Sequence, residues 1–175
     1  PDAQSAYVNR NFSMLERLLT QLRILPMYLE QMFWPSPSSL VFYYDWIEPS
    51  SSLVTPTTTW LGGLALAALA ASGIVLCQSR PLYAFGVFFF FAAHVLTSSF
   101  IALDLAFEHR NYLALLGVII AVSDITQLLS TRMPASISAT LVAAVLILLS
   151  SATTIRALTW ADPIVLANSL AKEAP

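Results

Sequence analysis

The chain has 175 residues, of which 57% are hydrophobic and only 10% are charged. Soluble domains usually carry about 25% charged residues, so this balance indicates a membrane protein. The formal net charge of −2 leaves no basic surface to neutralise phosphates, which argues against a nucleic-acid partner. Because the chain opens on Pro1 without a signal-like segment, we expect it to be processed or a piece of a longer polypeptide.

An amphipathic helix is predicted close to the N-terminus. Leucines recur at helical spacing over residues 15–25, and polar residues fall between them. Ser13 and Glu16 have the spacing of a capping box, whereas Pro26 should kink or interrupt the helix. We expect this helix to lie in the outer membrane interface, with its leucines against lipid or against the bundle. A core helix of a small extramembrane domain is the alternative. With the proline- and serine-rich loop that follows, it forms a first region over residues 1–57.

Four apolar stretches follow, each with the length of a membrane-spanning helix: residues 58–77, 82–103, 112–129 and 136–155. Small residues on the first stretch, including Gly62 and Gly73, would let another helix approach closely. The short linkers predict that the four helices are adjacent antiparallel neighbours. The predicted fold class is therefore all-α, with an integral membrane bundle of about four transmembrane helices over residues 58–155. Residues 156–175 are predicted to form a C-terminal extramembrane helix.

The orientation follows from two arginines. Arg80 and Arg132 lie in short linkers without acidic residues, and such linkers belong on the cytoplasmic side. Both termini and the linker at residues 104–111 are then extracytoplasmic. Membrane lipids are the expected surroundings of the bundle.

The linker between the second and third stretches concentrates charge, because it contains Asp104, Glu108, His109 and Arg110. Dehydrating ions at a membrane is costly, so such a cluster is a candidate functional site. A guanidinium offers a planar fork of donors suited to phosphate, and a histidine can donate to phosphate or exchange a proton near neutrality. A neighbouring carboxylate can hold the guanidinium or bind a sugar hydroxyl. The alternative is a self-neutralising helix cap in which Glu108 pairs with Arg110.

Two polar residues stand out inside the spans, His94 and Asp124. A hydrogen bond between them would join two helices, and we favour this structural role over a proton relay. Two isolated histidines without a cysteine cluster give no metal signature. Ligation of haem or a pigment by His94 is less favoured than a satisfied core histidine, so no cofactor is expected.

Residues 94–99 (HVLTSS) and 104–113 (DLAFEHRNYL) resemble a family of bacterial membrane proteins. Its members carry tetratricopeptide repeats and a glycosyltransferase-like domain of the GT-C type, and they are related to transmembrane O-mannosyltransferases. Residues 18–28 and 154–160 are similar to flanking segments of the same family. The resemblance implies a multi-pass protein of the bacterial inner membrane whose outer loops handle a polyprenyl-phosphate-linked sugar.

By this resemblance, Arg110 is the candidate phosphate contact, with Glu108 and His109 beside it. The family's catalytic carboxylate lies in a first outer loop, and no residue of this chain replaces it. We therefore expect the C-terminal membrane half of such a protein, inactive alone and associated with its N-terminal half. The alternative is a non-catalytic accessory subunit that packs against other transmembrane subunits.

Overall fold

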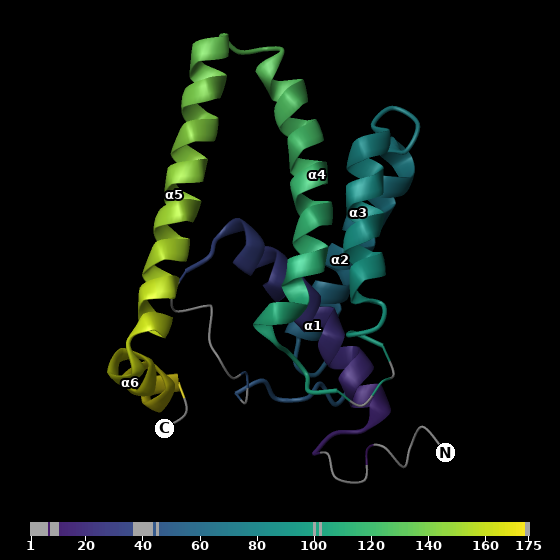
Figure 1. Ribbon diagram of the computed structural model, residues 1–175. Coiled ribbons are helices and arrows are strands. Elements are labelled where there is room, and N and C mark those ends of the chain that lie inside the picture. Colours follow the sequence, from purple (N-terminus) through teal and green to yellow (C-terminus); the bar gives the residue numbers. More distant parts are fainter. Residues whose placement is uncertain are drawn as a thin grey trace.

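A computed structural model describes residues 7, 11–36, 44, 46–99, 101 and 103–173, apart from the side chains of residues 108, 169, 170, 172 and 173. The described residues contain helices and no strand, which confirms the all-α prediction. Figure 1 shows a packed group formed by α1 to α4 and a separate long helix, α5, that ends at α6. The helices are α1 (Met14–Phe33), α2 (Thr58–Leu76), α3 (Pro81–His94), α4 (Asn111–Ser130), α5 (Ala135–Ala161) and α6 (Pro163–Glu173).

Helix α1 begins with the predicted capping box. The backbone N–H and the hydroxyl of Ser13 donate to Glu16 Oε2 at 2.7 and 2.8 Å, and the Glu16 N–H donates to Ser13 Oγ at 3.3 Å. Helix α1 runs through Pro26, so of the two predicted outcomes the interruption is wrong and the kink stays a prediction. Pro26 has no N–H for the carbonyl of Leu22, four residues earlier. The backbone of α2 lies against that carbonyl at Gly62, where an added Cβ would collide with its oxygen.

The buried face of α1 is unusually polar. Its buried residues follow helical spacing, but they include more polar side chains than apolar ones: Arg17, Thr20, Gln21, Ile24, Leu25, Tyr28 and Gln31. Leu15 is 65% exposed, and the other leucines before Leu25 are only partly buried. The leucines of α1 were predicted to lie against lipid or against the bundle, and for most of them the position against lipid fits better. Polar side chains of α1 face the bundle instead.

Glycines set the spacing between the apolar helices. A Cβ on Gly86 of α3 would collide with the carbonyl oxygen of Gly117 on α4, and a Cβ on Gly117 would lie 2.6 Å from the Gly86 oxygen. On α2, a Cβ on Gly73 would lie 3.2 Å from Val87. Such contacts bring backbones close together, as is typical of helix packing in membranes. The predicted close approach at Gly62 and Gly73 is confirmed.

Helix α3 is shorter than predicted, because it ends at His94 rather than near residue 103. At 1.5 Å per residue its 14 residues extend about 21 Å, less than the roughly 30 Å of a hydrocarbon core. The residues that follow turn away, and the carbonyls of Thr97 and Ser99 accept hydrogen bonds from Arg17 of α1. The guanidinium of a different helix thus satisfies carbonyl groups of this non-helical segment.

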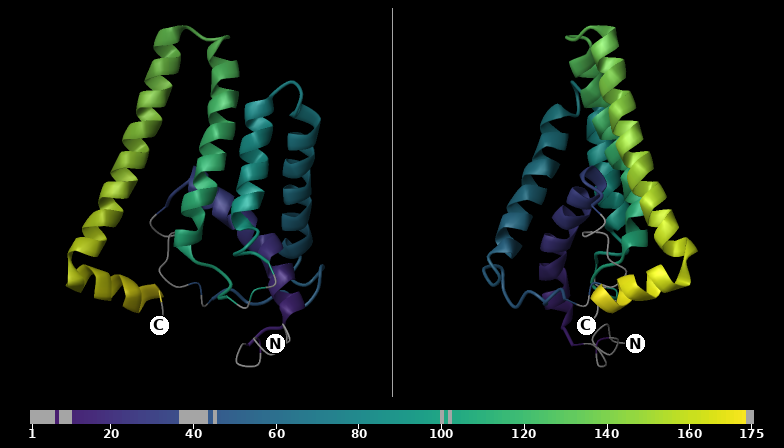
Figure 2. Two further views of the ribbon diagram at one scale, coloured as in Figure 1. Left: turned by 45° about the vertical axis from the view of Figure 1, so that its right-hand side comes forward. Right: turned by 90° about the vertical axis from the view of Figure 1, so that its left-hand side faces the viewer.

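Helix α5 stands apart from α4, as Figure 1 and the left view of Figure 2 show. It contains no buried residue, and among the described residues its substantial contact is with α6. The prediction that all four apolar helices pack as neighbours is therefore wrong for α5. Helix α6 begins at Pro163, where the Asp162 carboxylate accepts from the Ile164 N–H at 2.8 Å.

Three helices, α2, α4 and α5, are long and apolar enough to cross a membrane, and α3 is a shorter apolar helix. The chain is thus a helical membrane protein whose apolar surfaces suit lipid. The connections at residues 77–80 and 131–134 lie at one end of the molecule. The segment at residues 103–110, the first turn of α1 and α6 lie at the other end (Figures 1 and 2). The Arg80 and Arg132 linkers therefore share one end of the molecule, and the side of the membrane that this end faces stays a prediction.

Candidate functional site

The candidate site is organised by Arg17, near the start of α1, a residue that the sequence analysis did not single out. Its side chain is completely buried. The guanidinium donates to the carbonyl oxygens of Thr97 at 2.6 Å, Ser99 at 3.1 Å and Asp104 at 3.0 Å. A fourth acceptor is the carbonyl oxygen of Leu103. Hydrogen bonds from a charged donor are stronger than neutral ones, so Arg17 fixes the path of the segment between α3 and α4.

Arg110 shares an acceptor with Arg17. Its Nη1 donates to the carbonyl oxygen of Asp104 at 2.8 Å and to that of Leu105 at 3.4 Å. The guanidinium also lies 5.2 Å from the centre of the Phe107 ring, which suits a cation–π contact. The buried Arg17 and the half-buried Arg110 therefore share the Asp104 carbonyl oxygen as an acceptor, which links the two side chains.

Tyr28 of α1 is hydrogen-bonded to the backbone of Phe107, in the segment between α3 and α4. Its hydroxyl accepts a hydrogen bond from the Phe107 N–H at 2.8 Å and lies 3.2 Å from the Phe107 carbonyl oxygen, to which it donates. Burial raises the pKa of Tyr28, so the phenol stays neutral and able to donate. Burial lowers the pKa of Arg110, but a guanidinium remains charged at physiological pH. Arg110 therefore stays positively charged, and the nearby Asp104 carboxylate favours its charged form.

The other predicted residues of the linker have different positions. The Asp104 side chain is exposed, and its backbone carbonyl oxygen accepts hydrogen bonds from both arginines. His109 is exposed, and its ring centre lies 5.2 Å from that of Phe107. Glu108 begins a short 3-10 helix, η2 (Glu108–Arg110), but its side chain lies outside the described residues. The alternative pairing of Glu108 with Arg110 therefore stays a prediction.

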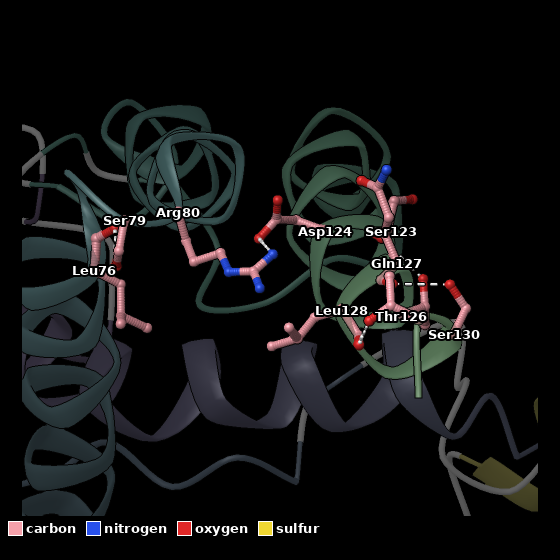
Figure 3. A network of polar contacts seen from close by, with 10 residues as sticks. Leu76, Ser79, Arg80, Ser123, Asp124, Thr126, Gln127, Leu128 and Ser130 are labelled. Carbon is pink, nitrogen blue, oxygen red and sulfur yellow. Dashed lines mark hydrogen bonds and ion pairs between the residues drawn. The ribbon is translucent and has the colours of Figure 1, made fainter. Parts of the chain in front are cut away.

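The predicted hydrogen bond between His94 and Asp124 is wrong. Helices α3 and α4 run antiparallel, so the last residue of α3 lies beside the start of α4, far along the helix from Asp124. Asp124 instead faces Arg80, with 3.8 Å between Arg80 Nη1 and Asp124 Oδ2 (Figure 3). Arg80 immediately precedes α3 and Asp124 lies in the second half of α4, whereas Arg110 precedes α4, so the ion pair is at the other end of these antiparallel helices from Arg110.

His94 lies under Tyr28 in the core of the packed group. The His94 and Tyr28 rings stack with their centres 5.5 Å apart. The centre of the Phe90 ring lies 4.8 Å from that of the His94 ring. Only 1% of His94 is exposed. The structure thus places His94 within the same cluster as the arginine site but leaves Asp124 outside it.

Three further residues of α1 contribute to the cluster and were missed in the sequence. Gln21 donates to the Leu105 carbonyl oxygen at 3.0 Å, and Gln31 accepts from Asn111 at 3.5 Å, while Tyr28 binds Phe107. A usable signal existed, because residues 17, 21, 28 and 31 fall on one face of a helix. The leucine pattern concealed it, since leucines ordinarily mark the buried face.

Within the described part of the chain, no group of three histidine, cysteine, aspartate or glutamate side chains is placed to hold a metal ion. No protein-family model, no curated protein and no solved structure matches the chain.

Proposed function

We propose that this chain is the membrane-embedded C-terminal part of a GT-C-like glycosyltransferase relative of the bacterial inner membrane. In this proposal the segment at residues 103–110 faces the extracytoplasmic side and binds a polyprenyl-phosphate-linked sugar. The chain supplies binding, and we assign no catalytic residue to it. The observation that carries the proposal is the state of Arg110, whose described hydrogen-bond acceptors are neutral carbonyl oxygens.

The acceptors of Arg110 orient its guanidinium without neutralising it. Carbonyl oxygens have no formal charge and leave the guanidinium charged, and the nearby Asp104 carboxylate favours this charged form. We infer that an anionic group binds Arg110 beside this carboxylate. Arg17 already donates to the Asp104 carbonyl, which limits the movement of this acceptor. A pre-oriented guanidinium loses little entropy on binding, and its fork of donors matches two oxygens of a phosphate. The site lies at one end of the apolar helices, where lipid headgroups would be its neighbours. We therefore infer that its ligand is the phosphate of a lipid-linked sugar.

Other polar side chains of the segment at residues 103–110 suit the rest of such a ligand. His109 can donate to a phosphate oxygen. Asp104 is placed to accept from a sugar hydroxyl, and we assign the same role to Glu108. The polyprenyl chain would lie along the apolar surfaces of the bundle.

The test is binding of polyprenyl phosphate to the full chain in lipid nanodiscs, measured by native mass spectrometry. We expect Arg110→Gln to weaken binding at least about 10-fold, because the variant removes a charge-assisted hydrogen bond to the phosphate. Arg132→Gln removes an exposed arginine at the opposite end and serves as the matched control. Equal binding by the wild type and a folded Arg110→Gln variant would contradict the proposal. Arg110→Lys should give an intermediate affinity, because it keeps the charge but not the fork.

The exposure of α5 favours a second candidate function, that of an accessory subunit that packs against other transmembrane helices. This helix has 27 residues, none of them buried. A depression along it is lined by small polar residues as well as aliphatic ones, including Ser150, Ser151 and Thr154. Small residues on a transmembrane helix allow close contact with a partner helix.

The two candidates predict different neighbours for α5. A photo-crosslinking residue at Leu146, placed in the native membrane, would label a defined protein if the chain is an accessory subunit. The same residue at Val75, on the exposed surface of α2, is the control. Labelling of lipid alone at both positions would count against the accessory role and leave the lipid-phosphate proposal standing.

A further inference from the structure

His94 has one ring nitrogen satisfied and one without a partner among the described residues. Nδ1 lies 3.0 Å from the carbonyl oxygen of Phe90. A carbonyl oxygen only accepts, so Nδ1 must carry a proton, and in the neutral ring Nε2 is then a lone-pair acceptor. Nε2 is buried, and no described group donates a hydrogen bond to it. The Asn111 side chain, at the start of α4, interacts with the imidazole.

Asn111 begins a chain of buried amide contacts that leads away from the histidine. Its Nδ2 donates to Gln31 Oε1 at 3.5 Å, and Gln31 Nε2 donates to the Tyr44 hydroxyl oxygen at 3.0 Å. Asn111 Oδ1 is buried and has no partner within the described part of the chain. The arrangement with a neutral ring thus leaves two buried acceptors unsatisfied, His94 Nε2 and Asn111 Oδ1. A buried acceptor without a donor is energetically unfavourable.

Two arrangements of the same side chains satisfy both atoms. If Nε2 binds a proton, the imidazolium donates to Asn111 Oδ1, and the other contacts stay as they are. If Nε2 stays unprotonated, a 180° rotation of both amides reverses every donor and acceptor. Asn111 Nδ2 then donates to Nε2, Gln31 Nε2 donates to Asn111 Oδ1, and the Tyr44 hydroxyl donates to Gln31 Oε1.

We propose that Nε2 of His94 is a proton-binding site. Its occupancy sets the direction of the buried hydrogen-bond chain that runs through Asn111 and Gln31 to Tyr44. One proton is gained at Nε2, no covalent bond to another heavy atom changes, and the Tyr44 hydroxyl switches from donor to acceptor. The chain joins the end of α3, the start of α4, the end of α1 and the segment that contains Tyr44.

Few other groups near the ring can take up or repel a proton. From α1, Tyr28 faces His94 through the stacked contact. Arg110, ahead of α4, acts on the ring through its positive charge. Helix α2 contains no charged residue, and the charged residue of α4, Asp124, is paired with Arg80 at the far end. The inference does not depend on a lipid-phosphate ligand.

The test is a pH titration of the full chain in nanodiscs, from about pH 4 to about pH 9, followed by ¹⁵N nuclear magnetic resonance. Labelled histidine reports the protonation of Nε2, and labelled asparagine and glutamine side chains report the amide contacts. We expect the Asn111 and Gln31 signals to move with the same midpoint as His94. The proposal is overturned if His94 titrates while both amide signals stay unchanged, or if His94 takes up no proton in this range.

Two variants sharpen the result. Asn111→Leu removes the middle of the chain, so the Gln31 signal should no longer follow the titration of His94. Gln127→Leu changes an exposed amide of the same helix and should leave the coupling intact. Persistent coupling in Asn111→Leu would also overturn the proposal. If Asn111→Leu does not fold, the wild-type titration decides alone.

Discussion

Two groups of helices, α1 to α4 on one side and α5 with α6 on the other, differ in the contacts that stabilise them. The first group has a buried arginine, several buried polar side chains of α1 and glycine contacts between backbones. The second has an apolar helix of 27 residues without a buried side chain. In a membrane, apolar surface gains little from burial against another helix, because lipid is equally apolar. Close backbone contacts between helices and hydrogen bonds from buried side chains, such as those of Arg17, therefore define the first group as a stable unit.

The largest expected effect is that of Arg17→Met, which leaves the carbonyl acceptors at residues 97–104 without their donor. Removing several buried charge-assisted hydrogen bonds should cost about 3 kcal/mol or more. The measurement is thermal or denaturant unfolding in detergent micelles. Arg132→Met is the control, because Arg132 is exposed. A stability loss no larger than that of the control would contradict the organising role of Arg17.

A matched pair of leucines compares the two regions directly. Leu66 of α2 is 7% exposed, whereas Leu146 of α5 is 58% exposed. We expect Leu66→Ala to lower the free energy of unfolding by about 2–4 kcal/mol, because it leaves a cavity. Leu146→Ala should change it by less than about 0.5 kcal/mol. Equal losses, measured by unfolding in micelles, would mean that α5 packs on the bundle.

Neighbouring glycines test the contact between α1 and α2. A Cβ on Gly62 meets the backbone carbonyl of Leu22, whereas a Cβ on Gly63 lies 3.5 Å from the flexible end of the Leu22 side chain. Gly62→Ala should therefore cost about 1–3 kcal/mol through overpacking. Gly63→Ala should be neutral or stabilising, since alanine favours a helix. The reverse order of the two unfolding temperatures would show that the helices do not cross here.

The smallest expected effect concerns pH and the start of α1. Hydrogen bonds from Ser13 lower the pKa of Glu16 from its ordinary value of 4.5. A carboxyl group with a lowered folded-state pKa adds stability above its unfolded-state value and loses it as the pH falls through the folded-state value. Glu16→Gln should lower the unfolding temperature slightly at neutral pH, with the difference vanishing in acid. A difference that grows in acid would exclude this origin.

Local patterns predicted much of the fold. The capping box at Ser13, the apolar helices and the small-residue contacts at Gly62 and Gly73 depend on neighbouring residues, and the structure contains them. The end of α3 at His94 could not be predicted in this way, because the acceptors beyond it are bound by Arg17, about 80 residues earlier in the chain. Composition records that Arg17 is charged but not which carbonyl groups compensate its burial.

The candidate site shows the same division. The charge cluster identified Arg110, but the sequence did not indicate that the backbone carbonyl of Asp104 accepts hydrogen bonds from both Arg17 and Arg110. The error in pairing His94 with Asp124 has a related cause. Both are polar residues in apolar helices, and only the antiparallel register of α3 and α4 places them at opposite ends.

Thiol labelling of intact cells tests most directly whether Arg110 faces the extracytoplasmic side. The native Cys77 is exposed at the end of α2, beside the Arg80 linker, so a membrane-impermeant maleimide should not reach it from outside. In a Cys77→Ser background, His109→Cys places the single thiol beside Arg110 and should react from outside. Labelling of Cys77 from outside, together with protection of His109→Cys, would contradict the orientation and the proposed lipid-phosphate site with it.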